Sequence, residues 1–131
     1  MTAIAYVDSS ALVRLLVDEA GSAGMTRWYV EAERVLSSRI GIVETRRAVG
    51  RRAGKPDPGL VDRILQSLEV FELDADIGRA AATVGPPGLR TLDAIHLATA
   101  LAIPGVDAFV TYDDRLAEAA RALGLPVVSP A

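Results

Sequence analysis

The chain has 131 residues, half of them hydrophobic, as expected for one domain with a single sizeable core. It contains no cysteine, so disulfides and thiolate-bound metals are excluded, and no stretch reaches the roughly 20 apolar residues of a membrane-spanning helix. The formal net charge of −3 excludes nucleic-acid binding through overall charge, so such binding would need a local basic patch. Because the N-terminus MTAIAYVDSS lacks a basic region and soon reaches Asp8, we expect no signal peptide and a cytoplasmic protein.

Strands and helices are predicted to alternate along the chain. The apolar run 4–7 predicts a buried strand, and leucines at helical spacing predict a helix over 9–20 that ends at Gly21. Next we expect a helix over 23–33, a strand over 34–38, a helix over 41–54, a turn over 55–59, a helix over 60–70, a strand over 70–74 and a helix over 76–84. After the loop GPPG at 85–88 follow a helix over 92–103, a strand over 108–112, a helix over 114–123 and a strand over 126–129.

This alternation favours one α/β domain over residues 1–131, with a mostly parallel sheet between two layers of helices. In such open sheets, binding sites form outside the carboxyl ends of the strands. Asp8 and Asp113 each follow a predicted strand directly. Asp93 stands at a helix start, and Glu44 lies in the first turns of a helix that follows another strand. We therefore expect these four acids to face the same edge of the sheet.

Each acid also has a simpler structural explanation. Asp8 can cap the following helix, and Asp93 and Glu44 can interact with helix dipoles. Asp113 and its neighbour Asp114 can both be turn or cap residues. Capping explains each acid singly, whereas four carboxylates at one edge repel unless a cation neutralises them. Oxygen ligands without cysteine or a histidine cluster favour Mg²⁺ or Mn²⁺, which commonly serve phosphoryl chemistry.

Four segments carry these acids. YVDSSALVRLL contains Asp8 and Ser10, VETRRA contains Glu44, LRTLDAIHLATA contains Asp93, and TYDDRL contains Thr111 and Asp113. In this order, and over nearly the whole chain, they resemble the motifs of PIN-domain ribonucleases, specifically the VapC-type toxins of type II toxin–antitoxin systems. LRTLDAIHLATA is the most specific match.

The resemblance implies a PIN-like three-layer α/β/α sandwich and a Mg²⁺- or Mn²⁺-dependent endoribonuclease that cleaves tRNA or rRNA and so inhibits translation and growth. It also implies a cognate VapB-type antitoxin that neutralises the toxin, a homodimer, no membrane association, and DNA contact only through the antitoxin. All four acids of the family pattern are present.

On this interpretation Asp8, Asp93 and Asp113 hold one or two metal ions. Glu44 holds a second ion or orients the attacking water. Ser10 and Thr111 carry hydroxyls that can orient the carboxylates, although helix capping and strand-end bonding explain them equally well. The position in the motif favours Asp113 over Asp114 as the closer ligand, with Asp114 as an outer helper.

Other residues leave alternatives open. His96, the one histidine, lies within reach of Asp93 at i+3; a structural or Asp93-orienting role is favoured over a general base. A basic cluster can be an RNA-binding rim, a solvated helix face or the surface that receives the antitoxin; it comprises Arg46, Arg47, Arg51, Arg52 and Lys55. Trp28 and Tyr29 can anchor a partner or belong to the core.

The motifs argue against three other classes of protein. A haloacid-dehalogenase-like phosphatase needs D-x-D after its first strand, where this chain has DSSA. A phospho-accepting receiver domain needs paired early acids and a late lysine, but the one lysine is Lys55. The third alternative is a PIN module that only binds RNA or protein, and the retention of all four acids argues against it.

Overall fold

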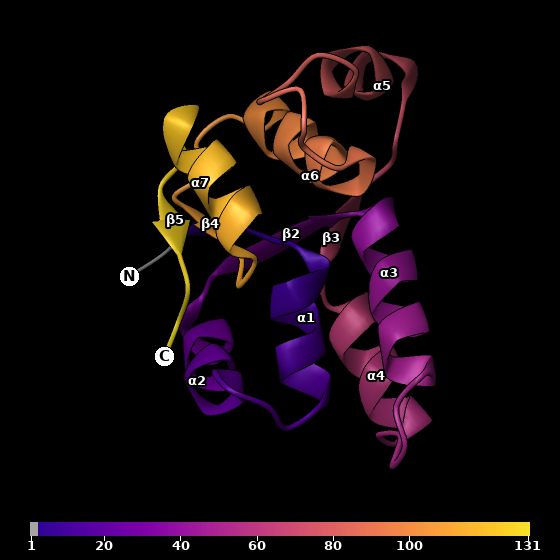
Figure 1. The fold of residues 1–131 in the computed structure, drawn as a ribbon. Helices are drawn as coiled ribbons and strands as arrows, with labels where there is room; N and C mark the ends of the chain where they lie inside the picture. The colour runs from indigo at the N-terminus through magenta and orange to yellow at the C-terminus, as the bar shows by residue number, and fades with distance from the viewer. Residues whose placement is uncertain (1–2) are drawn as a thin grey trace.

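The computed structural model describes residues 3–131 and places a five-stranded, wholly parallel sheet between layers of helices (Figure 1). The strands are β1 (Ile4–Val7), β2 (Arg34–Ser38), β3 (Glu69–Phe71), β4 (Ala108–Val110) and β5 (Val127–Val128), in the spatial order β3-β2-β1-β4-β5. The helices are α1 (Ser9–Leu16), α2 (Ser22–Glu31), α3 (Arg39–Gly50), α4 (Pro58–Gln66), α5 (Ala75–Ala81), α6 (Thr91–Ala102) and α7 (Asp114–Ala122). The α/β/α sandwich expected from the sequence is confirmed.

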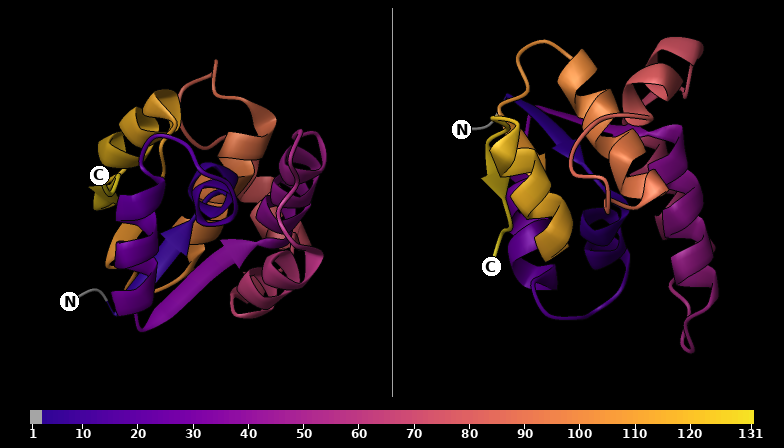
Figure 2. Two further views of the ribbon diagram at one scale, coloured as in Figure 1. Left: turned by 90° about the horizontal axis from the view of Figure 1, so that it is seen from below. Right: turned by 45° about the horizontal axis from the view of Figure 1, so that its top comes forward.

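Two hydrophobic layers form because successive strand residues point to opposite faces of the sheet. On β4, for example, Ala108 and Val110 face the layer built by α1 to α4, whereas Phe109 faces the layer built by α6 and α7. Tyr6 on β1 joins Phe109 on this second face, and their rings stack with centroids 5.4 Å apart. Figure 2 shows α6 lying between α7 and α3, so that α6 meets both the sheet and the first helical layer.

The strand order reverses direction between β1 and β4. From β1 the chain adds β2 and β3 on one side, then crosses to add β4 and β5 on the other. The register Ala5↔Ala108, Tyr6↔Phe109 and Val7↔Val110 aligns the two strand ends. Such a switch point opens a crevice at the carboxyl edge of the sheet. Asp8 lies directly after β1 at this point, and Thr111 lies directly after β4.

All twelve predicted elements are present within residues 3–131, but several boundaries differ from the predictions. The helix predicted over 41–54 begins at Arg39, because the Ser38 hydroxyl accepts a hydrogen bond from Ile40 N–H, and it ends at Gly50. The helix predicted over 60–70 begins at Pro58, where the Asp57 side chain caps it. It ends at Gln66, so β3 starts at Glu69.

The first helix also differs, since α1 ends at Leu16 and the backbone at Val17 is extended. The remaining predicted bounds differ by up to three residues at either end. Within residues 3–131, no helix is long and apolar enough to cross a membrane.

One glycine is required by close packing between α3, β2 and α6. A methyl group at Gly41 would lie 2.6 Å from Ser37 Oγ and 3.1 Å from Cε1 of His96. Ser37 is itself fixed, since its hydroxyl donates to the Val7 carbonyl over 2.7 Å. A side chain at position 41 must therefore push apart two buried groups.

We expect Gly41→Ala to lower the free energy of unfolding by about 1–2 kcal/mol, because overpacking outweighs the gain in helix propensity. Gly50→Ala, in the same helix, is the matched control, since an added methyl group there meets no atom within 4 Å. The control should be as stable as the wild type or up to about 1 kcal/mol more stable. Urea unfolding followed by circular dichroism measures both, and equal effects of the two substitutions would contradict the packing argument.

Candidate active site

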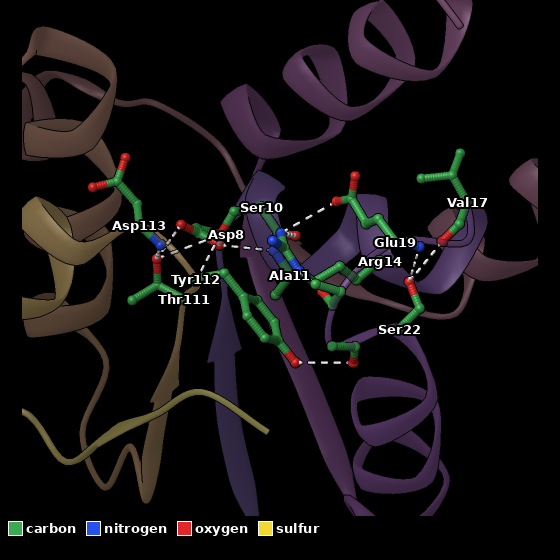
Figure 3. Close-up of polar contacts among 12 residues, drawn as sticks. Asp8, Ser10, Ala11, Arg14, Val17, Glu19, Ser22, Thr111, Tyr112 and Asp113 are labelled. Atoms are coloured by element: carbon green, nitrogen blue, oxygen red, sulfur yellow. Dashed lines mark hydrogen bonds and ion pairs between the residues drawn. The ribbon is translucent and has the colours of Figure 1, made fainter. Parts of the chain in front are cut away.

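Asp8 is the buried centre of the polar contacts at the switch point. Its side chain caps α1 by accepting from Ala11 N–H over 3.0 Å, and Ser10 Oγ donates to the same Oδ1 over 2.7 Å. Thr111 Oγ1 donates to Oδ2 over 2.6 Å. Figure 3 shows these side chains converging from the ends of β1 and β4. Asp8 is therefore both a helix cap and a carboxylate held at the carboxyl edge of the sheet.

The two hydroxyls also bind the backbone that follows β4. Ser10 Oγ accepts from Tyr112 N–H over 2.8 Å, and Thr111 Oγ1 accepts from Asp113 N–H over 3.1 Å. Each hydroxyl thus donates to Asp8 and accepts from the chain that leads into α7. This arrangement fixes the start of α7, and with it Asp113, relative to Asp8.

Asp8 is only 3% exposed, and burial raises the pKa of its carboxyl above the ordinary value. The hydrogen bonds from Ser10 and Thr111 lower this pKa without cancelling the effect of burial. Burial also raises the pKa of Asp93, although Arg90 contacts it. Both sites therefore disfavour an unneutralised carboxylate, and a bound cation would relieve that cost.

Asp93 and Asp113 are joined by Arg90. Arg90 Nε donates to Asp93 Oδ2 over 3.1 Å, and Nη2 donates to Asp113 Oδ2 over 2.8 Å. The other oxygen of Asp113 caps α7 by accepting from Leu116 N–H over 3.0 Å. Asp93 lies in the first turn of α6, where the helix dipole favours a negative charge.

Glu44 projects from the second turn of α3 and is held by a buried chain of hydrogen bonds. Its Oε1 lies 2.7 Å from His96 Nε2, and His96 Nδ1 lies 2.7 Å from the Tyr6 hydroxyl. Because burial raises the pKa of Tyr6 well above its ordinary value, Tyr6 keeps its proton and can donate it to Nδ1. His96 Nε2 then carries the ring proton and donates it to Glu44.

Of the two roles expected for His96, the structure supports the structural one and not the orientation of Asp93, since the ring contacts Glu44 instead. His96 is 1% exposed, which places it in the core and leaves it no access to a substrate.

The four acids line one depression of about 260 Å³ at the carboxyl edge of the sheet. Its other lining residues are Ser9, Ser10, Arg90, Thr91 and Leu92. Asp114 is exposed and does not line this depression, whereas Asp113 does. We call this depression the acid pocket.

The donor set of the acid pocket fits a divalent cation such as Mg²⁺ or Mn²⁺, because it consists of carboxylates with hydroxyl support. With the side chains as they stand in residues 3–131, no three Asp, Glu or His residues surround a common point closely enough to bind an ion. The guanidinium of Arg90 bridges two of the carboxylates instead. A cation bound by Asp93 and Asp113 would have to displace it.

The basic cluster, which lies on α3 and in the segment directly after it, is partly neutralised. Arg46 pairs with Asp62 over 3.0 Å, and Arg52 pairs with Glu19 over 2.6 Å. Arg47 and Arg51 are exposed, and within the described part of the chain neither forms an ion pair within 4.0 Å. Trp28 and Tyr29 are half-buried on α2 and pack against the core, as one of the two interpretations of the sequence proposed.

Sequence reasoning did not identify Arg90 or Tyr6 as site residues. Arg90 lies three residues before Asp93, which is the spacing that brings side chains together at a helix start, so a local signal was present. Tyr6 carried no comparable signal, because its contact with His96 spans 90 residues.

The strand order and the acid pocket together define a parallel α/β fold whose acidic residues gather at the switch point of the sheet. The chain belongs to the PIN-domain family, whose family model matches residues 5–122. Ribonuclease VapC35 of Mycobacterium tuberculosis is 44% identical to it over 132 residues, covering 95% of this chain and 96% of that protein. Ribonuclease VapC47 of the same species is 38% identical over 133 residues, with coverage of 95% and 96%. The resemblance to VapC ribonucleases is thereby confirmed.

Solved structures agree on the fold. VapC20 of M. tuberculosis, described as a toxin that cleaves the sarcin–ricin loop, superposes with a TM-score of 0.73 at 20% identity, covering 96% of this chain and 99% of that one. The VapBC2 complex of Rickettsia felis, bound to a promoter DNA fragment, gives a TM-score of 0.71 at 13% identity, with coverage of 98% and 99%. At these identities the likeness shows the PIN fold alone.

The substitution Asp8→Asn tests the buried charge, because the asparagine amide keeps one oxygen that can cap α1 but carries no charge. A raised pKa in the folded state means that the folded wild type binds this proton more tightly than the unfolded chain does. Wild-type stability relative to Asp8→Asn should therefore fall as the pH rises from about 3.9, the ordinary Asp pKa, through the raised value. We therefore expect Asp8→Asn to gain stability relative to the wild type as the pH rises from about 4 to 7, measured by urea unfolding in EDTA.

Asp76→Asn on α5 is the control, because it removes an exposed carboxylate whose contact in the structure is an ion pair with Arg79, and its stability should stay close to that of the wild type. An Asp8→Asn protein whose stability relative to the wild type grows as the pH falls would contradict the raised pKa.

Proposed function

We propose that this protein is a divalent-cation-dependent endoribonuclease and the toxin of a type II toxin–antitoxin system. The observation that carries the proposal is the convergence of Asp8, Glu44, Asp93 and Asp113 in one pocket at the switch point of a PIN fold. Relatives that share up to 44% of the sequence over nearly its full length are named ribonucleases, which supports RNA as the substrate.

Asp8, Asp93 and Asp113 would hold the cation, Mg²⁺ or Mn²⁺, or two such ions together with Glu44. A divalent ion at such a site lowers the pKa of a bound water and neutralises charge on the phosphate. Ser10 and Thr111 keep the Asp8 carboxylate in one orientation through their hydroxyls. Asp93 and Asp113 line the same pocket, and Arg90 binds one carboxylate oxygen of each.

Glu44 would orient the attacking water, since its side chain lines the pocket and is fixed on one side by His96. Hydrolysis forms a bond between the water oxygen and phosphorus and breaks the bond from phosphorus to the 3′ oxygen. The water gives up a proton through Glu44 or solvent, and the leaving 3′ oxygen takes up a proton from solvent, so the products are a 5′-phosphate and a 3′-hydroxyl. Arg47 on α3 and Arg51 directly after it are both exposed, and they would bind flanking RNA phosphates together with Arg46 and Arg52.

The proposed partners follow from the relatives. The VapBC2 complex and a VapBC complex of M. tuberculosis contain toxin and antitoxin chains, which supports a cognate VapB-type antitoxin for this chain. We further propose a cytoplasmic homodimer that acts on tRNA or rRNA and contacts DNA only through its antitoxin. Asp114 would act at most as an outer helper, because it is exposed beside Asp113.

Removing one carboxylate of the acid pocket should abolish RNA cleavage. We expect Asp8→Asn and Asp93→Asn to lower the rate constant for cleavage of cellular RNA with Mg²⁺ or Mn²⁺ by at least about 100-fold, since even outer contacts of a metal site contribute 10–100-fold. Sequencing the ends of the cleaved RNA should show 5′-phosphates. Asp76→Asn, which retains every acid of the pocket, should cleave like the wild type.

Undiminished cleavage by either folded variant would overturn the assignment of these residues. If the wild type binds Mn²⁺ but cleaves no RNA from a broad panel, the non-catalytic PIN module is the correct interpretation instead.

The role in the cell is tested separately. Induced expression of the wild type should halt incorporation of labelled amino acids and stop growth, whereas Asp93→Asn at the same protein level should do neither, because it lacks one carboxylate of the pocket. Equal arrest by both proteins would show that inhibition does not depend on the acid pocket.

A further inference from the structure

Arg90 contributes a positive charge to a pocket otherwise lined by acidic, hydroxyl and apolar side chains. Among the lining residues of the acid pocket, all within the described part of the chain, it is the one basic residue. Its guanidinium binds one oxygen of Asp93 and one of Asp113, over 3.1 and 2.8 Å. The other oxygen of Asp113 already caps α7, so a cation at Asp113 would need the oxygen that Arg90 holds. Arg90 and such a cation therefore compete for the same ligands.

The surroundings of Arg90 allow its side chain to leave. The side chain is 65% exposed, and as the N-terminal cap residue of α6 it makes no side-chain capping bond. It also lines a second, larger groove of about 680 Å³ beside the acid pocket, where the other walls come from the loop before α6 and from α7. Rotation out of the acid pocket thus breaks two ion pairs and disturbs no buried packing.

The negative charge of the acid pocket gives a displaced Arg90 a second binding partner, the phosphate of the substrate. A phosphodiester that approaches four carboxylates is repelled unless positive charge meets it. Guanidinium binds phosphate oxygens through two parallel hydrogen bonds, and its planar donors suit phosphate as well as carboxylate. An arginine displaced from Asp93 and Asp113 remains beside the pocket, next to the position where the substrate phosphate must lie.

We infer that Arg90 is a substrate-binding residue that is held on Asp93 and Asp113 in the cation-free protein and, once a divalent cation takes these carboxylates, binds a phosphate of the RNA. The inference rests on the proposed function. It assigns two opposite effects to one side chain: Arg90 weakens cation binding and strengthens RNA binding.

The first test measures Mn²⁺ binding by isothermal titration calorimetry without RNA. Arg90→Ala should bind Mn²⁺ roughly fivefold more tightly than the wild type, because the two competing ion pairs, which are weak at this exposure, are gone. Arg115→Ala is the matched control, since Arg115 lines the same groove but contacts neither carboxylate. It removes an equal charge and should leave the Mn²⁺ affinity within about twofold of the wild type.

The second test measures cleavage of an RNA oligonucleotide at saturating Mn²⁺. Arg90→Ala should raise KM about tenfold, as expected for loss of one charge-assisted contact to phosphate. Arg90→Lys, which keeps the charge, should restore part of this loss. A purely structural role would weaken Mn²⁺ binding and RNA binding together, so the opposite signs are the diagnostic result. Circular dichroism of each variant confirms that it is folded.

The outcomes separate this inference from the proposed function. If the wild type binds Mn²⁺ and cleaves RNA but Arg90→Ala binds Mn²⁺ no more tightly, or has an unchanged KM, the inference is wrong and the proposed function stands. If Arg115→Ala tightens Mn²⁺ binding as much as Arg90→Ala, general electrostatics accounts for the effect and the inference is again wrong. If the wild type binds no Mn²⁺, both the inference about Arg90 and the proposed function are wrong.

Discussion

The contact between the Asp8 carboxylate and the hydroxyls of Ser10 and Thr111 is the interaction on which the rest of the site depends. Through it, the end of the central strand β1 is tied to the start of α1 and to the end of β4. The backbone amides of Tyr112 and Asp113 bind the same two hydroxyls, so the entry to α7 is fixed as well. One buried charge thus organises three elements, and its raised pKa shows that this position costs free energy in the absence of a cation.

Much of the fold could be predicted because each element has a local signal. Short apolar runs mark the strands, helical spacing of leucine and alanine marks the helices, and strands separated by one or two helices favour parallel pairing. The ends of the helices were harder to predict, since they depend on which polar side chain caps the backbone. Ser38 is both the last residue of β2 and the cap of α3, and Asp57 caps α4 within a segment that resembles a turn. Composition alone does not distinguish these roles.

The acids of the candidate site could also be predicted, because strand ends of a parallel sheet share one edge and the four motifs occur in the order of a known family. The hydrogen-bond partners of these acids could not be predicted. His96 reaches Glu44 across the interface between α6 and α3, although Asp93 is nearer in sequence. Which of two neighbours a side chain meets depends on how α6 packs between α7 and α3, and that packing leaves no signal in a single sequence.

The hydrogen bond from Thr111 to Asp8 has a consequence for the order in which the protein is made. It joins residues 103 positions apart, and β4 is the fourth of five strands in the chain. A nascent chain that lacks β4 has neither the Thr111 hydroxyl nor Asp113, so its acid pocket is incomplete. The acid pocket therefore cannot assemble during synthesis until the chain has been made through Asp113 and β4 has paired with β1.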